Sequence, residues 1–134
     1  MATVSLIRYE NATPEVKAIF DDIKRTRKLD EVNNFWMALA NHPETLRRTW
    51  ETVKQVMRAG ALDELTKEMI YVAVSITNNC EYCIHSHTAA AFGKGMTAEQ
   101  YQELVAVTAT AHQTNVLANT FKVPVDSKFQ AKQP

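Results

Sequence analysis

Glycine and proline are scarce in this chain, and that scarcity most constrains what it can fold into. Among 134 residues there are only three glycines and four prolines. An all-β domain needs many tight turns, which these two residue types supply, whereas a helical domain needs few. Apolar residues also recur three and four positions apart, as on one face of a helix. We therefore predict an all-α fold, a single compact helical domain over residues 1–134 with about six to seven helices.

Capping residues mark where the expected helices begin. Thr13-Pro14-Glu15, Asp63 and the capping box Thr97-Ala98-Glu99-Gln100 each precede a run of helical periodicity. In the first half of the chain the predicted helices run from Pro14 to about Lys28, over 35–40 and from 43 to about 58. In the second half they run over about 64–77, from Cys80 to near Gly93 or Gly95, and from Thr97 to about Phe121 with a break near Thr110. Residues 1–12 are expected to form an extended lead-in and residues 122–134 a polar tail.

The segment 69–76 is apolar nearly all round, so periodicity alone could also indicate a strand. Its length, its polar lead-in and the helical context favour a buried helix. The two tryptophans are expected to pack in the core.

Charge and hydropathy exclude several classes of function. Lysine and arginine total 15 and aspartate and glutamate total 15, so the formal net charge is zero. Nucleic acid or anionic lipid would require a clustered basic surface. No apolar stretch approaches the ~18 residues of a membrane span, and residues 1–10 do not resemble a secretory signal. We expect a cytoplasmic protein that binds neither nucleic acid nor membrane.

The chemistry is concentrated in the segment 80–87, which reads Cys-Glu-Tyr-Cys-Ile-His-Ser-His. On a helix Cys80, Cys83 and His87 lie at positions i, i+3 and i+7 and share one face. His85 lies two residues after Cys83 and points elsewhere. The spacing therefore selects His87, not His85, as the imidazole beside Cys83.

A pair of thiols at the start of a helix suits redox chemistry. Unpaired backbone N–H groups and the positive end of the helix dipole stabilise a thiolate, the reactive form. Two cysteines three residues apart can close a disulfide within one turn. A sulfenic acid formed on one is then resolved by the other before further oxidation. An imidazole one turn after Cys83 can take up its proton.

The sequence also supplies a carboxylate. Glu68 is embedded in the apolar segment twelve residues before Cys80. A carboxylate in such surroundings needs a partner if it is buried. We expect that partner to be His87, directly or through a water, so that the carboxylate orients the imidazole.

These residues carry a resemblance to a known family. The pattern Glu68-x11-Cys80-x2-Cys83-x3-His87 resembles the alkylhydroperoxidase D (AhpD)-like branch of the carboxymuconolactone decarboxylase superfamily. The flanking segments Leu62-Asp63 and Ala73-Val74-Ser75, and the small residues after His87, are similar too. The similarity covers about residues 35–120.

The resemblance implies an all-α homo-oligomer, a trimer or a hexamer, that reduces alkyl or hydrogen peroxides without a metal or other cofactor. Cys83 would attack the peroxide, Cys80 would resolve it as a disulfide, and Glu68 and His87 would relay protons. A lipoyl or thioredoxin-like donor would return the electrons. In one respect the chain departs from the family pattern, because Tyr82 stands where its best-known members carry a histidine before the second cysteine.

Other interpretations stay open at this point. The same two cysteines would serve a dithiol adaptor that passes electrons from a lipoyl or thioredoxin-like donor to another peroxidase. Cys80, Cys83 and His87 could also supply three ligands to a metal, with Glu68 or His85 as a fourth. A third possibility is a non-catalytic scaffold in which the cysteines are structural.

Overall fold

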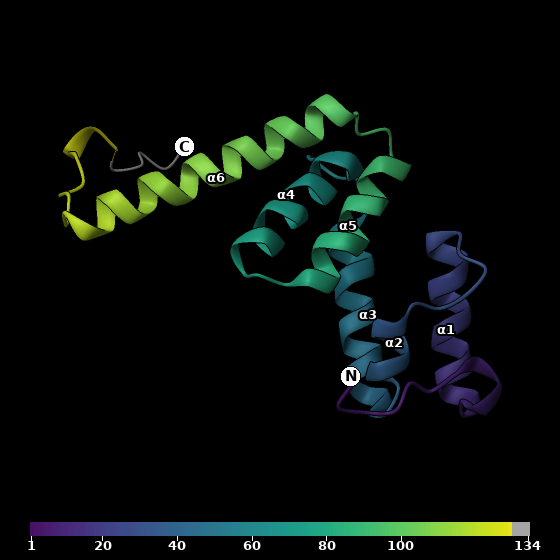
Figure 1. Cartoon of the computed structure of the whole chain (residues 1–134). Helices are drawn as coiled ribbons and strands as arrows, with labels where there is room; N and C mark the ends of the chain where they lie inside the picture. Colours follow the sequence, from purple (N-terminus) through teal and green to yellow (C-terminus); the bar gives the residue numbers. More distant parts are fainter. Residues whose placement is uncertain (130–134) are drawn as a thin grey trace. The chain divides into compact units, whose positions relative to one another are not determined.

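A computed structural model describes residues 1–129, which form six α-helices and two short 3-10 turns and contain no strand (Figure 1). The elements are η1 (Tyr9–Asn11), α1 (Pro14–Arg27), α2 (Asn34–Leu39), α3 (Pro43–Met57), α4 (Glu64–Thr77), α5 (Glu81–Gly93), α6 (Ala98–Thr120) and η2 (Ser127–Phe129). The all-α fold class and its helix number are thereby confirmed. The chain divides into two compact units, residues 1–58 and the residues from 59 onward. One domain over 1–134 stays a prediction.

The helix starts expected from capping residues are where the sequence places them. The Thr13 hydroxyl accepts from the Val16 N–H, and the Asp63 carboxylate accepts from the Thr66 N–H. Thr97 and Gln100 form the reciprocal capping box at the start of α6. These side chains satisfy backbone donors that the first turn of a helix leaves unpaired.

Some boundaries differ from the expectation. Helix α5 begins at Glu81 and leaves Cys80 as its N-cap, and α6 runs without a break through Thr110. Threonine lowers helix propensity only modestly, so nothing local interrupts α6. The lead-in contains the turn η1, and Ala12 beside it is buried. Residues 130–134 of the expected tail lie outside the described residues.

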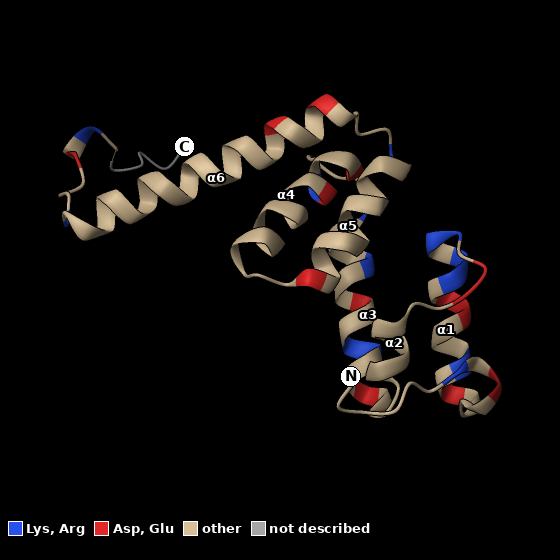
Figure 2. Cartoon of the chain, in the orientation of Figure 1, with Lys and Arg blue, Asp and Glu red and all other residues tan. Residues whose placement is uncertain are grey.

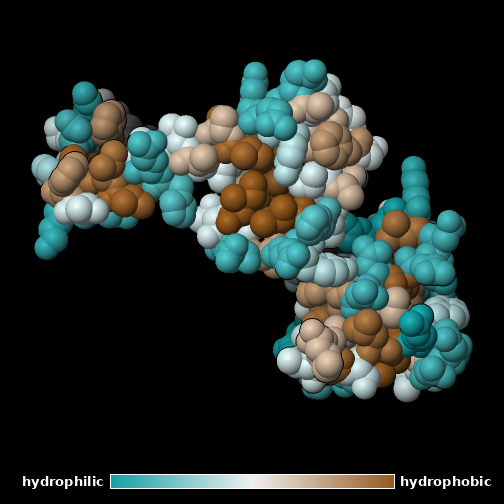
Figure 3. Space-filling model, in the orientation of Figure 1, coloured by the Kyte–Doolittle hydropathy of each residue, from teal (hydrophilic) through white to brown (hydrophobic). Residues whose placement is uncertain are grey.

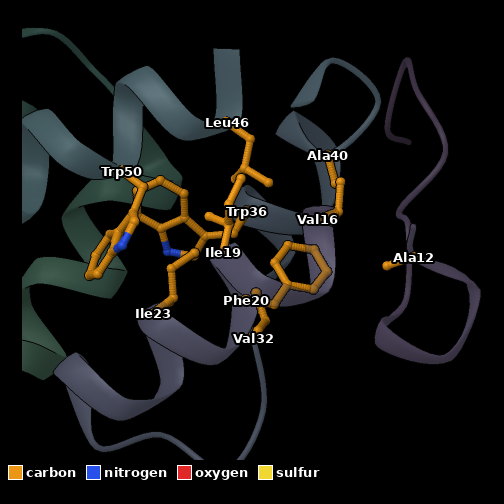
Figure 4. Packing of buried hydrophobic residues seen from close by; sticks show 10 residues of the cluster. All are labelled: Ala12, Val16, Ile19, Phe20, Ile23, Val32, Trp36, Ala40, Leu46 and Trp50. Atoms are coloured by element: carbon orange, nitrogen blue, oxygen red, sulfur yellow. The ribbon is translucent and has the colours of Figure 1, made fainter. Parts of the chain in front are cut away.

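The unit 1–58 holds a compact apolar core between α1, α2 and α3 (Figure 4). The indole rings of Trp36 and Trp50 meet edge to face, with centroids 5.5 Å apart. The Trp50 indole N–H donates to Asp22 at 2.7 Å, and the Lys54 ammonium donates to the same carboxylate oxygen at 2.8 Å. Both tryptophans are core residues, as predicted. The core consists of Ala12, Val16, Ile19, Phe20, Ile23, Val32, Trp36, Ala40, Leu46 and Trp50.

In the second unit α4 packs along α5, and α6 packs against α4 (Figure 1). The buried face of α4 carries Glu68, Val72 and Ser75, at positions i, i+4 and i+7. The segment 69–76 is helical, as predicted, but it is buried on one side only. Ile70 and Val74 are about half exposed, so these two apolar side chains form surface.

Charged residues are unevenly distributed along the chain (Figure 2). Helix α6 carries only Glu99 and Glu103, both near its start. None of the helices in residues 1–129 is both long enough and apolar enough to cross a bilayer.

Candidate functional site

The turn between α4 and α5 sets the position of the two cysteines. Asn79 adopts a left-handed conformation, with φ 55°. Its N–H donates to the Ile76 carbonyl and the Cys80 N–H donates to the Ser75 carbonyl. This pair of bonds is the Schellman arrangement that ends a helix, and asparagine tolerates the left-handed backbone better than most residues. Because Cys80 immediately becomes the N-cap of α5, Cys83 lies in the first turn of that helix.

The two thiols differ in acidity. Both are free and half-buried. The thiol and the backbone N–H of Cys83 lower the pKa of Cys80. Burial, followed by the neighbouring Cys80 sulfur, raises the pKa of Cys83 to about 11. These surroundings favour the thiolate on Cys80 and the protonated thiol on Cys83.

Glu68 and His87 form a buried pair across the α4–α5 contact. The Nδ1 atom of His87 lies 2.6 Å from Oε2 of Glu68. His87 is 8% exposed and Glu68 is 3% exposed, so little water reaches the pair. An ionised carboxylate can only accept, so it holds the proton on Nδ1 and leaves Nε2 of the neutral ring as the basic nitrogen. The contact expected from sequence is present and is direct.

Tyr71 completes this arrangement. Its ring stacks on the His87 imidazole, with centroids 3.5 Å apart and planes 18° from parallel. Tyr71 follows Glu68 by three residues, so both project toward α5 from the same side of α4. Tyr71 lies outside the segment 80–87 that carries both cysteines and His87. Its one signal is that i, i+3 spacing from Glu68.

The other side of the first turns of α5 is open. A depression of about 480 Å³ is lined by Glu81, Tyr82, His85 and Ser86. His85 is exposed there, whereas His87 is buried, so the two imidazoles occupy different surroundings. Within residues 1–129 no cluster of three or more histidine, cysteine, aspartate or glutamate side chains is arranged to hold a metal ion.

Residues 43–126 match the sequence model of the carboxymuconolactone decarboxylase family, a span of more than half the chain. The chain belongs to the carboxymuconolactone decarboxylase family. All four predicted site residues, Glu68, Cys80, Cys83 and His87, lie inside the matched span.

Within that family the chain falls in the AhpD-like branch, as the sequence predicts. A solved structure of the alkylhydroperoxidase AhpD core from Rhodospirillum rubrum is 55% identical and superposes with a TM-score of 0.94. The similarity covers 98% of this chain and 99% of that one.

Two uncharacterised proteins are similar over shorter spans. Protein 4 of the cox locus of Paracoccus denitrificans is 43% identical over 56 residues, which is 42% of this chain and 50% of that protein. A protein of Cupriavidus necator is 30% identical over 81 residues, 60% of this chain and 72% of its own length. The match therefore spans half the length of the Paracoccus protein.

Proposed function

We propose that this protein is a thiol-dependent peroxidase that reduces alkyl or hydrogen peroxides through a Cys80/Cys83 dithiol–disulfide cycle. The observation that carries the proposal is a dithiol at a helix N-terminus, one turn from a histidine bonded to a buried glutamate. Similarity over nearly the whole chain to an AhpD alkylhydroperoxidase core supports it.

One turn of the cycle reduces one peroxide and oxidises the two thiols to a disulfide. The Cys83 thiolate attacks the terminal peroxide oxygen, the O–O bond breaks, and the alkoxide leaves as an alcohol after taking a proton. Cys83 is now a sulfenic acid. The Cys80 thiolate attacks that sulfur, the S–O bond breaks, water leaves and a disulfide remains. A dithiol donor returns two electrons and two protons and is itself oxidised to a disulfide.

The raised pKa of Cys83 explains why the site would need a base. With a pKa of about 11, only about one Cys83 thiol in 10⁴ is ionised at neutral pH. We assign the removal of its proton to Nε2 of His87, with Glu68 stabilising the imidazolium that forms. A positioned base of this kind contributes roughly 10²–10⁴-fold to a rate.

Single-cysteine variants test the cycle and the roles. Cys83→Ser should abolish peroxide consumption, while Cys80→Ser should give one burst that ends in a sulfenic acid, trapped by a dimedone-type reagent. The lowered pKa of Cys80 makes the opposite roles chemically reasonable, with Cys80 attacking the peroxide and Cys83 resolving it. A burst that depends on Cys80 instead would show that the helix N-terminus, and not His87, selects the nucleophile.

A second candidate function is favoured by the acidity of Cys80. A half-buried thiolate at a helix N-terminus is suited to exchange with the disulfide of another protein. The chain would then be an adaptor between a lipoyl or thioredoxin-like donor and a separate peroxidase. Peroxide consumption by the purified protein with dihydrolipoamide alone supports the peroxidase. Consumption only after a peroxidase is added supports the adaptor. In either case we place the cycle in the reducing cytoplasm, where thiol pairs stay available.

We also propose that the protein is a homo-oligomer, a trimer or a hexamer, assembled through α6. Residues 109–120 are all exposed, and no lysine, arginine, aspartate or glutamate occurs between Glu103 and the end of the helix. Hydrophobic surface gathers over α4 and at the C-terminal end of α6 (Figure 3). Isolated helical turns are marginal in water, so a partner surface would stabilise this half of α6. Exposed apolar side chains on α6 and its C-cap include Val107, Val116, Leu117 and Phe121.

A further inference from the structure

Two contacts hold the His87 imidazole, and they constrain different motions. The hydrogen bond from Nδ1 to Glu68 fixes one atom, but hydrogen bonds tolerate tens of degrees of misalignment. The face contact with Tyr71 at 3.5 Å restricts the plane of the ring. Together they hold Nε2 on the side of the ring away from Glu68.

We infer that Tyr71 is a positioning residue that fixes the plane of the His87 imidazole for proton exchange with Cys83. This inference rests on the proposed function, because it takes His87 as the base. Cys83 and His87 are one turn apart on the same face of α5, so a small rotation of the ring changes the approach of Nε2 to the sulfur. Geometry at this level decides how efficiently a base works.

The stacked ring has a second consequence, which appears when His87 takes up a proton. The face of a phenol ring is electron-rich and attracts a cation lying over it. The Tyr71 face therefore also holds the ring in place after it has accepted a proton. Both effects use the face of the ring, which phenylalanine also presents, so Tyr71→Phe should keep them.

Three variants separate these contributions. Tyr71→Phe keeps the stacked face, whereas Tyr71→Met keeps most of the volume and removes the ring. Tyr101→Met is the matched control, because Tyr101 contacts Phe92 near the other end of α5. Each variant is made in the wild-type chain and in the Cys80→Ser chain, where Cys83 is the only thiol.

The readouts are the nitrogen-15 and proton resonances of the His87 ring and the rate of Cys83 alkylation by iodoacetamide against pH. We expect the wild-type ring protons of His87 to resonate upfield, because they lie over an aromatic face, and Tyr71→Phe to keep that shift. Tyr71→Met should lose the upfield shift and should reduce the share of the neutral His87 ring that is protonated on Nδ1. It should also slow Cys83 alkylation near neutral pH about 3- to 30-fold. Tyr101→Met should leave both readouts unchanged.

Two results would overturn the inference. One is a wild-type His87 ring with no upfield shift, which needs no variant and holds even if Tyr71→Met fails to fold. The other is a Tyr71→Phe protein as slow in alkylation as Tyr71→Met, which would assign the effect to the hydroxyl. Failure of the proposed function looks different. The ring and alkylation readouts would respond to Tyr71→Met as expected, while the wild-type protein consumes no peroxide.

Discussion

At the scale of single residues, the two sulfurs of the dithiol are in unequal surroundings. The pKa of Cys80 is lowered by the thiol and the N–H of Cys83, whereas burial raises the pKa of Cys83. Because only the thiolate reacts with an alkylating agent, we predict that limiting iodoacetamide modifies Cys80 first at neutral pH. Modification of Cys83 should lag behind that of Cys80 at neutral pH and should rise further as the pH approaches about 11. Peptide mapping by mass spectrometry measures the order, and preferential labelling of Cys83 would contradict it.

The buried Glu68–His87 pair leads to a second residue-scale prediction. Glu68→Gln keeps the shape of the side chain but removes the charge that favours an imidazolium. We expect a loss of about 10²–10⁴-fold in kcat/KM for a hydroperoxide, close to the loss in His87→Ala. Because the two side chains act as one unit, the double variant should be little worse than either single one.

His85→Ala is the matched control for that pair, since His85 is exposed on the other side of α5. It should be close to wild type. Full activity in Glu68→Gln, or a defect in His85→Ala as large as that in His87→Ala, would exclude the relay.

At the scale of helices, Asp22 links α1 to α3 in the unit 1–58. The Lys54 ammonium and the Trp50 indole both donate to it and lower its pKa below the ordinary value of 3.8. A carboxyl group whose pKa is lower in the folded than in the unfolded protein stabilises the fold at pH values above its unfolded pKa. That stabilisation is lost as the pH falls through the pKa of the folded state. We predict that Asp22→Asn lowers the thermal midpoint by a few degrees at pH 6, and that the difference from wild type shrinks below about pH 4.

Thermal unfolding followed by circular dichroism across pH 2.5–7 would measure that difference. Glu51→Gln is the control, because Glu51 also pairs with Lys54 but is exposed and lies on the same helix, α3. A difference between wild type and Asp22→Asn that persists unchanged at the lowest pH would contradict this account of Asp22.

How far these features can be predicted from sequence depends on the range of the forces involved. The starts of α1, α4 and α6 rest on Thr13, Asp63 and Thr97, whose side chains bond to backbone N–H groups three residues on. Local rules therefore suffice for them. The candidate site is predictable as a set of residues because spacing on a helix places Cys83 and His87 on one face.

The stack of Tyr71 on His87 and the order of acidity within the dithiol depend on how α4 and α5 pack. The pKa of Cys83 is set mainly by burial and not by proximity to the helix N-terminus. Its raised pKa therefore has no local signature in the sequence. The exposure of Ile70 and Val74 is likewise a property of packing, since their apolarity alone indicates burial.

At the scale of the whole molecule, the exposed and uncharged second half of α6 predicts self-association. We expect light scattering coupled to size exclusion to give a mass of three or six chains. Val116→Glu together with Leu117→Glu should shift the protein toward the monomer, because a charge in an apolar interface is costly to desolvate. Val4→Glu, at an exposed apolar position outside α6, is the control. A wild-type protein that is monomeric at micromolar concentration would refute the proposed assembly.

The dithiol–disulfide cycle is tested most directly by the mass of the intact protein after one equivalent of a hydroperoxide and a quench with excess alkylating agent. We predict that the wild-type protein loses the mass of two hydrogen atoms, takes up no alkyl group, and yields a peptide in which Cys80 is joined to Cys83. A protein in which both thiols are still fully alkylated after the peroxide has been added would contradict the cycle.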